Sequence, residues 1–254
     1  MTAGDVRGRR FWGDGRVLAV AHRGASRYAP ENTLPAFALA LDEGVPAVEC
    51  DIQRTRDGRV VVIHDQTVDR TTDGRGAVAA LTFEELRRLD AGRWFAPEFA
   101  GTRIPLLDEV LDLVRGRGLL KVEIKNAPTF YEGIEQQALE AIRHRGMEEH
   151  VFLMSFDHES VRTVRALSPH SPTGIIYAAR LADGPAAARA ADADALCPHW
   201  AYVTDGVVAG AHAAGLRVLV WTADEADVIR RCVALGVDGI TSNDSRLLRR
   251  VLGT

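Results

Sequence analysis

Carboxylate side chains occur in two apolar runs of the sequence, where they could hold a metal ion. Glu49 and Asp51 lie in the run 47–53, and Glu123 lies in the run 119–125. If the first run is a strand, Glu49 and Asp51 point to the same face, because side chains alternate along a strand. Three carboxylates brought together repel one another, and oxygen ligands suit Mg²⁺ or Ca²⁺. The pattern therefore favours one divalent cation.

Two histidines accompany these acids and could carry protons. His22 lies near the end of the apolar run 16–24, and His64 near the end of the run 59–65. The ordinary pKa of histidine is about 6.5, so one ring can act as a base and the other as an acid near neutral pH. A lone histidine is more often structural, but two beside an acidic cluster favour an acid–base pair. The other histidines have no assigned chemistry, and His199 is singled out only because it ends a predicted strand.

Two cationic residues adjoin the same groups and could bind a phosphate. Arg23 follows His22, and Lys125 lies two residues after Glu123. A guanidinium group can bind two phosphate oxygens, and an ammonium group adds a compact positive charge. The alternative is that both cations neutralise Glu49 and Glu123. The two roles are compatible if a substrate displaces the ion pairs.

Aromatic and basic residues near these positions have less specific roles. Trp221 ends an apolar run, and an apolar wall for the substrate and core packing are equal alternatives for it. Trp94 is expected to pack in a core. Lys121 shares a face with Glu123, one residue pair deeper in the strand, where it could neutralise a carboxylate.

The bulk composition is that of a folded enzyme-sized chain rather than a nucleic-acid-binding or membrane protein. The 254 residues are 46% apolar and 26% charged, with a formal net charge of −4. A chain without a basic field is a poor partner for nucleic acid. No apolar run approaches the ~20 residues of a membrane span, and segment 1–16 lacks the apolar core of a signal peptide. We therefore expect a soluble cytoplasmic protein that acts on a small molecule.

The three cysteines point away from disulfides. Cys50, Cys197 and Cys232 are odd in number and far apart in the sequence. This spacing matches neither a disulfide framework nor a cysteine metal site. They are predicted to be buried free thiols.

Apolar runs alternate with amphipathic stretches through most of the chain, and this order predicts the fold. Alternation predicts a parallel sheet, and eight units predict a closed (β/α)8 barrel, the TIM barrel. In such barrels the reactive groups lie at the C-terminal ends of the strands. Asn32 is predicted to cap the first helix and Gly44 to end it. The predicted strands are 16–24, 47–53, 119–125, 151–156, 173–177, 195–200, 217–222 and 238–242.

One apolar run breaks the alternation. The run 59–65 follows the second strand after only the turn TRDG, which is too short for a parallel crossover. It is predicted to pair antiparallel with the second strand, in a hairpin turned at Asp57-Gly58. Residues 66–105 show no strand–helix pattern and are predicted to form an insertion subdomain over the barrel mouth. The chain 1–254 is then a single α/β barrel domain with this insertion.

These motifs closely resemble those of the glycerophosphodiester phosphodiesterases. The stretch HRGASRYAPENTLPAFALALDEG looks like the opening signature of that family, and ECDIQRTRDGRVVVIHD looks like its second signature. The stretch KVEIK looks like its third acidic element. The likeness extends over roughly residues 18–245. HRG with PENT, followed by ExD and HD at this spacing, is a specific combination.

The resemblance implies both a fold and an activity. It implies a (β/α)8 barrel with an insertion that cleaves glycerophosphodiesters to sn-glycerol 3-phosphate and an alcohol such as choline or ethanolamine. Ser245 departs from the family pattern, which often has proline there, and Lys121 replaces a residue that is usually small or polar. By resemblance, His22 and His64 are the acid and base, Glu49, Asp51 and Glu123 hold Mg²⁺ or Ca²⁺, and Arg23 and Lys125 contact the phosphate.

The predicted reaction is metal-assisted hydrolysis of a phosphodiester, and it has two rivals. The attacking group is water or the glycerol 2-hydroxyl of the substrate, the latter through a cyclic phosphate. A lysophospholipase D or a cyclising phospholipase would need an apolar groove for its lipid, and no exposed apolar stretch demands one. A barrel that only binds phosphorylated ligands should have lost a histidine or a carboxylate, and all are present.

Overall fold

Eight parallel strands form a closed barrel, which confirms the predicted (β/α)8 fold. The computed structural model describes residues 15–254, so nearly all of segment 1–16 lies outside the described residues. The order around the barrel is β1-β2-β4-β5-β6-β7-β8-β9, and β9 pairs with β1. The strands are β1 (Leu18–Ala21), β2 (Ala47–Arg54), β3 (Val60–Val62), β4 (Leu119–Ile124), β5 (Val151–Ser155), β6 (Thr173–Tyr177), β7 (Ala195–Pro198), β8 (Arg217–Val220) and β9 (Gly239–Ser242).

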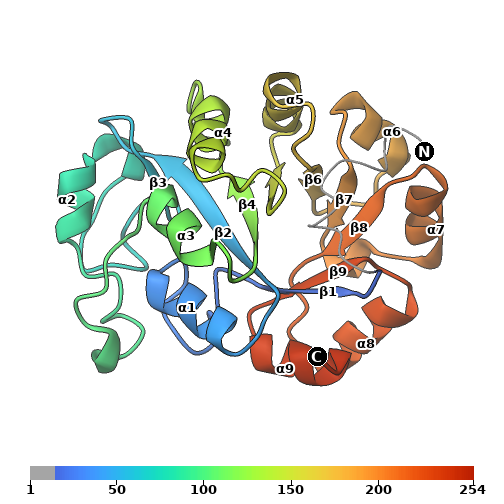
Figure 1. The fold of residues 1–254 in the computed structure, drawn as a ribbon, viewed down its shortest axis with the longest axis horizontal. Helices are drawn as coiled ribbons and strands as arrows, with labels where there is room; N and C mark the ends of the chain where they lie inside the picture. Colours follow the sequence, from blue (N-terminus) through green and yellow to red (C-terminus); the bar gives the residue numbers. More distant parts are fainter. Residues whose placement is uncertain (1–14) are drawn as a thin grey trace.

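Helices connect the parallel strands and surround them (Figure 1). The α-helices are α1 (Leu34–Asp42), α2 (Phe83–Arg88), α3 (Leu107–Val114), α4 (Ile134–His144), α5 (His158–Leu167), α6 (Gly184–Ala190), α7 (Asp205–Ala213), α8 (Ala226–Ala234) and α9 (Ser245–Leu252). Three short 3₁₀ helices among the described residues are η2 (Val78–Ala80), η3 (Pro97–Phe99) and η4 (Trp200–Tyr202). The crossover helices bury one face against the strands, as parallel barrels require.

The exceptional apolar run forms the predicted hairpin. β3 pairs antiparallel with β2, with Arg54 opposite Val60 and Ile52 opposite Val62. The chain reverses at Gly58, which has a φ of +81°. Beyond the strand, the N–H of Ile63 still bonds to the carbonyl of Asp51 at 3.0 Å. His64 is thereby brought back along β2 to the level of Asp51.

Residues 66–105 contain η2, α2 and η3 and lie at one side of the barrel, beside β3 (Figure 1). A small apolar cluster holds this segment against β3. It consists of Val61, Ile63, Val68, Val78, Leu86, Ala91 and Ile104. The short helix α2 has a capping box, in which Thr82 and Glu85 satisfy each other's backbone N–H groups. The segment therefore packs against the hairpin rather than against a barrel helix.

Alternation along the strands divides their side chains between the barrel interior and the layer beneath the helices. Phe152, Ile176 and Cys197 belong to the interior apolar cluster. Their neighbours Leu153 and Leu196 belong to the large cluster between the strands and the helices. This apolar half of the interior comes mainly from β5 to β8. The opposite half, from β2 and β4, carries charged side chains.

Two predictions from composition can be compared with the structure. The three cysteines are buried and free, as predicted. Among residues 15–254, no helix has the length and apolar character needed to cross a bilayer.

The first helix begins one residue later than predicted. Thr33, not Asn32, occupies the N-cap position, and its side chain makes no capping hydrogen bond. Asn32 instead has a φ of +58°, and its side chain bonds to Asp51. The prediction for Asn32 was wrong because a contact with β2 takes the side chain that local geometry would use as a cap. Gly44 ends the helix as predicted, with its N–H bonded to the carbonyl of Leu41.

The loop after β1 fits tightly against α1. Gly24 has a φ of +79°, and a Cβ placed there would lie 2.6 Å from the carbonyl carbon of Ala36. The N–H of Ala25 bonds to the oxygen of that same carbonyl at 2.9 Å. Gly24 therefore allows the loop that carries His22 and Arg23 to approach the helix backbone.

We predict that Gly24→Ala destabilises the protein more than Gly58→Ala does. Both glycines have left-handed φ values, but a Cβ at Gly58 would meet nothing within 4 Å. The left-handed conformation should cost each variant about 1 kcal/mol of unfolding free energy. Overlap with α1 should add roughly 1–3 kcal/mol in Gly24→Ala. Urea unfolding of both variants measures the difference, and equal losses would contradict the tight fit.

Candidate active site

The three predicted metal ligands meet near the C-terminal end of β4, at the level where β2 continues into the hairpin. Asp51 is paired in register with Glu123, and Glu49 with Lys121. One oxygen from each of the three carboxylates lies within 4.8 Å of the others. All three side chains are buried. The alternation of β2 and β4 thus directs these acids into one small volume.

Burial and mutual repulsion act on the pKa values of these acids. Burial, followed by the charges of Asp51 and Glu123, raises the pKa of Glu49 well above its usual range. Burial and the charge of Asp51 raise the pKa of Glu123 to about 7. Burial also opposes the ionisation of Asp51, but the charges of Arg23, His64 and Lys125 lower its pKa. One acid is held charged at the expense of its neighbours.

The carboxylates suit a divalent cation. Oδ1 of Asp51 is buried and has no hydrogen-bond partner among residues 15–254, and its other oxygen accepts from Asn32 at 2.8 Å. Nζ of Lys125 lies 4.0 Å from Oδ1, too far for a hydrogen bond, and a buried carboxylate oxygen without a close donor is costly unless a cation binds it. The donor set is made only of oxygens, as Mg²⁺ and Ca²⁺ prefer. Glu49, Asp51 and Glu123 therefore fit a hard metal ion.

The two predicted phosphate-binding cations already pair with these acids. Nε of Arg23 lies 3.3 Å from Asp51, and Nζ of Lys125 donates to Glu123 at 2.7 Å. The backbone N–H of Arg23 also donates to Glu49 at 3.0 Å. A neutralising role is therefore present, but the guanidinium group of Arg23 pairs with Asp51 and not with Glu49, the partner considered from the sequence. Both side chains remain about 15% exposed and can be reached from solvent.

His22 is oriented by a residue from the far end of the chain. Its Nδ1 lies 2.7 Å from Oδ1 of Asn243. Nδ2 of Asn243 donates to Asp224 at 2.6 Å, which turns Oδ1 toward His22. Nδ1 of His22 is therefore the protonated nitrogen, and Nε2, 3.9 Å from Glu49, has a free lone pair in the neutral ring. Burial and the charge of Arg23 lower the pKa of His22 to about 4.

His64 has a carboxylate partner instead. Its Nδ1 donates to Asp65 at 2.8 Å, and its Nε2 lies 3.2 Å from Nζ of Lys125. Burial lowers the pKa of His64. Both predicted histidines thus point Nε2 toward the acidic cluster and hold Nδ1 on a fixed partner.

An ion-pair network that the sequence did not predict supports both sides of the site. Arg70, from the inserted segment, donates to both oxygens of Glu31 at 2.8 Å and to Asp65 at 2.7 and 2.9 Å. Glu31 also accepts from Arg23 at 2.8 Å. Arg70 therefore links the partner of Arg23 to the partner of His64. Its position in a segment without strand–helix pattern gave no signal of this role.

Aromatic rings form the opposite side of the barrel mouth. Trp221 is half-buried, donates from Nε1 to the carbonyl of Cys197 at 2.8 Å and contacts the interior apolar cluster. Its ring meets Phe156 edge-on with centroids 5.5 Å apart, and the ring of His199 at 5.2 Å. Phe156 is 44% exposed, and the centroid of its ring lies 5.8 Å from Nζ of Lys125. Both roles considered for Trp221 agree with this position, and Phe156 extends the wall.

Two other residues differ from expectation or gain an account. Trp94 is 39% exposed and its ring packs edge-on against Phe95, so the prediction of core packing was wrong. Lys121 is fully buried in the barrel interior, where Nζ donates to Thr241 at 3.2 Å. Its charge lowers the pKa of Glu49, which opposes the stronger effect of burial. Lys121 is thus an internal counter-charge beneath the acids.

Comparisons with known proteins point to one family. The family model described as "Glycerophosphoryl diester phosphodiesterase family" matches residues 22–247. A curated glycerophosphodiester phosphodiesterase of Caldanaerobacter subterraneus is 40% identical over 92% of this chain and 96% of its own length. One from Bacillus altitudinis is 38% identical over 87% of this chain and 91% of its own length.

Solved structures share both fold and family. The crystal structure of a glycerophosphodiester phosphodiesterase from Agrobacterium tumefaciens has a TM-score of 0.82 and 32% identity, covering 92% of this chain and 99% of that one. An Oleispira antarctica phosphodiesterase, solved in complex with its product sn-glycerol 3-phosphate, has a TM-score of 0.86 and 27% identity, covering 97% and 99%. With a family match over most of its length and relatives near 40% identity, the chain belongs to the glycerophosphoryl diester phosphodiesterase family of enzymes.

Proposed function

We propose that this chain hydrolyses glycerophosphodiesters to sn-glycerol 3-phosphate and an alcohol, with one Mg²⁺ or Ca²⁺ ion held by Glu49, Asp51 and Glu123. The observation that carries the proposal is the convergence of three buried carboxylates with two histidine Nε2 atoms at one barrel mouth. The product bound to the Oleispira antarctica relative supports the substrate class. When bound, a divalent cation lowers the pKa of an attacking hydroxyl and offsets charge at phosphorus.

Arg23 and Lys125 bind the phosphate in this proposal. Both cations form ion pairs with the acids, and each keeps part of its side chain open to solvent. A bound diester exchanges part of their ion pairs for bonds to its non-bridging oxygens. These bonds strengthen as negative charge builds on the phosphoryl oxygens, which lowers the barrier.

His22 is the base and His64 is the acid. The neutral His22 ring, with its proton held on Nδ1 by Asn243, offers Nε2 to the attacking hydroxyl. His64 bonds to the Asp65 carboxylate, which favours the protonated ring against the burial and the charges of Arg23 and Lys125 that lower its pKa. The oxygen that attacks phosphorus gives its proton to His22. The bond from phosphorus to the alcohol oxygen breaks, and that oxygen takes the proton of His64.

Removal of the metal is expected to abolish turnover. Incubation with a chelator should stop release of choline from glycerophosphocholine, and excess Mg²⁺ or Ca²⁺ should restore it. Asp51→Asn removes the negative charge of the carboxylate to which the unpaired oxygen belongs. Calorimetry should therefore detect at least about tenfold weaker metal binding. Asp227→Asn, an exposed acid on α8, is the control and should bind metal normally. Full turnover after exhaustive chelation would remove the metal from the mechanism.

The two histidine variants should respond differently to the leaving group. His22→Asn and His64→Asn should each lower kcat for glycerophosphocholine by about 10²–10⁴-fold. The p-nitrophenolate group of a p-nitrophenyl diester leaves without needing a proton. This substrate should therefore largely restore the kcat of His64→Asn but not that of His22→Asn.

The measurement is kcat on both substrates, with circular dichroism to establish folding. Rescue of His22→Asn alone would reverse the two roles. Rescue of neither variant would argue against a division into acid and base.

Arg70→Gln tests the network from the inserted segment. Loss of its four bonds should loosen Glu31 and Asp65 together and lower kcat/KM by about 10–100-fold. Arg56→Gln is the control, since Arg56 forms an exposed ion pair with Glu85 away from the acids. Because Arg70 acts through Asp65, the p-nitrophenyl diester should recover part of the loss. An unchanged kcat/KM would show that the network does not position the site.

A further inference from the structure

A pocket that is separate from the candidate active site lies outside the barrel, between the loops that lead into α6 and α7. Its volume is about 300 Å³, and it is lined by residues 177–185 in part, by Leu196 and by the first turns of α7. No residue assigned to the candidate active site lines it. Tyr177 and Leu196 belong to the layer between the strands and the helices, so the pocket is separated from the barrel interior by the strands themselves.

Glycines on α7 leave this space open. Gly206 and Gly210 are four residues apart, so they lie on the same face of the helix, and both line the pocket. A Cβ at Gly210 would meet nothing within 4 Å, and one at Gly206 would meet only the hydroxyl of Thr204, at 3.9 Å. Leu196 and Val207 supply apolar wall.

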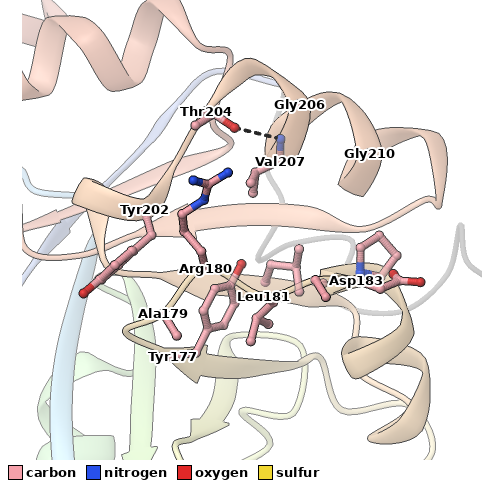
Figure 2. Close-up of a pocket in the computed structure, with 14 residues that line it drawn as sticks. Tyr177, Ala179, Arg180, Leu181, Asp183, Tyr202, Thr204, Gly206, Val207 and Gly210 are labelled. Atoms are coloured by element: carbon pink, nitrogen blue, oxygen red, sulfur yellow. Dashed lines mark hydrogen bonds between the residues drawn. The ribbon is translucent and has the colours of Figure 1, made fainter.

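Two donors that have no partner among residues 15–254 extend into the pocket. Tyr177 is only 8% exposed, yet its hydroxyl has no hydrogen-bond partner within the described part of the chain. Arg180 likewise forms no ion pair or hydrogen bond with residues 15–254. Figure 2 shows both side chains extending toward Val207 at the start of α7. Burial raises the pKa of Tyr177 to about 12, so its hydroxyl keeps its proton.

The helix end adds further donors, and two acids lie near the pocket: Asp183, which accepts a hydrogen bond, and Asp205, which begins α7 but is not part of the lining. The first N–H groups of a helix have no partner within it, and Gly206 lies in that turn of α7. The hydroxyl of Thr204 accepts from the N–H of Val207 at 3.4 Å, and its carbonyl accepts from the N–H groups of Val207 and Val208, which leaves those of Asp205 and Gly206. Asp183 lies at the other end of the pocket, where it accepts from the N–H of Ala186 at 2.8 Å (Figure 2). Positive charge and donors therefore gather at one end.

We propose that this pocket binds a small phosphate monoester. Arg180, Tyr177 and the first turn of α7 would bind its phosphate, and Leu196 and Val207 would contact its carbon chain. A guanidinium group and a helix N-terminus both favour an oxyanion. The site is distinct from the acidic cluster, and it does not depend on the proposed reaction.

Calorimetric titration of the full chain in chelator tests the proposal. Inorganic phosphate and sn-glycerol 3-phosphate are the probes, and Arg23→Gln serves as the background because it weakens the other anion site. In that background one binding event should remain. Adding Arg180→Gln should weaken it at least about tenfold. Tyr177→Phe should weaken it about two- to tenfold, because one hydrogen bond is lost.

Gly210→Leu provides an independent arm, because its side chain fills the pocket from a helix position. It should abolish binding while improving helix propensity. Arg162→Gln, an exposed arginine on α5, is the matched control and should bind as the background does. Thermal unfolding establishes that each variant is folded, and Arg180→Gln decides if Gly210→Leu is not.

Tighter binding of sn-glycerol 3-phosphate than of inorganic phosphate supports a site for phosphate esters. Equal binding supports a site that recognises the phosphate group alone. No binding to Arg23→Gln, or binding unchanged by Arg180→Gln, would overturn the proposal. Turnover of a glycerophosphodiester by Arg180→Gln should equal that of the wild type. Failure of the proposed reaction would appear in the turnover of the wild type and would leave these titrations unaffected.

Discussion

The structure depends on the crowding of three carboxylates in one buried space. At separations within 4.8 Å, each pair of charged acids repels by about 3 kcal/mol at an effective dielectric constant of 20. Arg23 and Lys125 face the acids from the mouth, and Lys121 lies beneath them. These cations reduce the repulsion, but Oδ1 of Asp51 still lacks a donor within residues 15–254. The three carboxylates thus form a place where a further cation is favourable, at a cost in mutual repulsion.

Backbone conformation near the acids shows where that cost falls. Arg23 and Asn32 have φ values of +56° and +58°, a region that costs most residues other than glycine roughly 1–2 kcal/mol and asparagine less. The N–H of Arg23 reaches Glu49, and the amide of Asn32 reaches Asp51. The loop therefore gives up local stability to place donors on buried carboxylates. Tight contact between Gly24 and α1 holds the loop in this conformation.

The fold and the convergence of Glu49, Asp51 and His64 could be predicted because both follow local rules. Period-two alternation put Glu49 and Asp51 on one face, and the short TRDG turn required the antiparallel hairpin that returns His64. The supporting residues could not be predicted in this way. Asn243 reaches His22 across 221 positions, and Arg70 reaches Glu31 across 39. Asn32 misled for the same reason, since a contact with β2 outweighed its local preference for capping a helix.

The division of the barrel interior explains why the charged groups gather where they do. Buried charge is tolerated only where other charges or donors face it, so acids and bases must share the same strands. β2 and β4 are neighbours, and their paired registers place Asp51 beside Glu123 and Glu49 beside Lys121. Apolar residues of β5 to β8 fill the other half, with Phe156 and Trp221 at the mouth. Because this half offers few polar partners, the proposed function requires the phosphate of a phosphodiester to lie toward β2 and β4. In that proposal, the same separation of charged and apolar halves that makes the core stable also sets the direction in which a substrate binds.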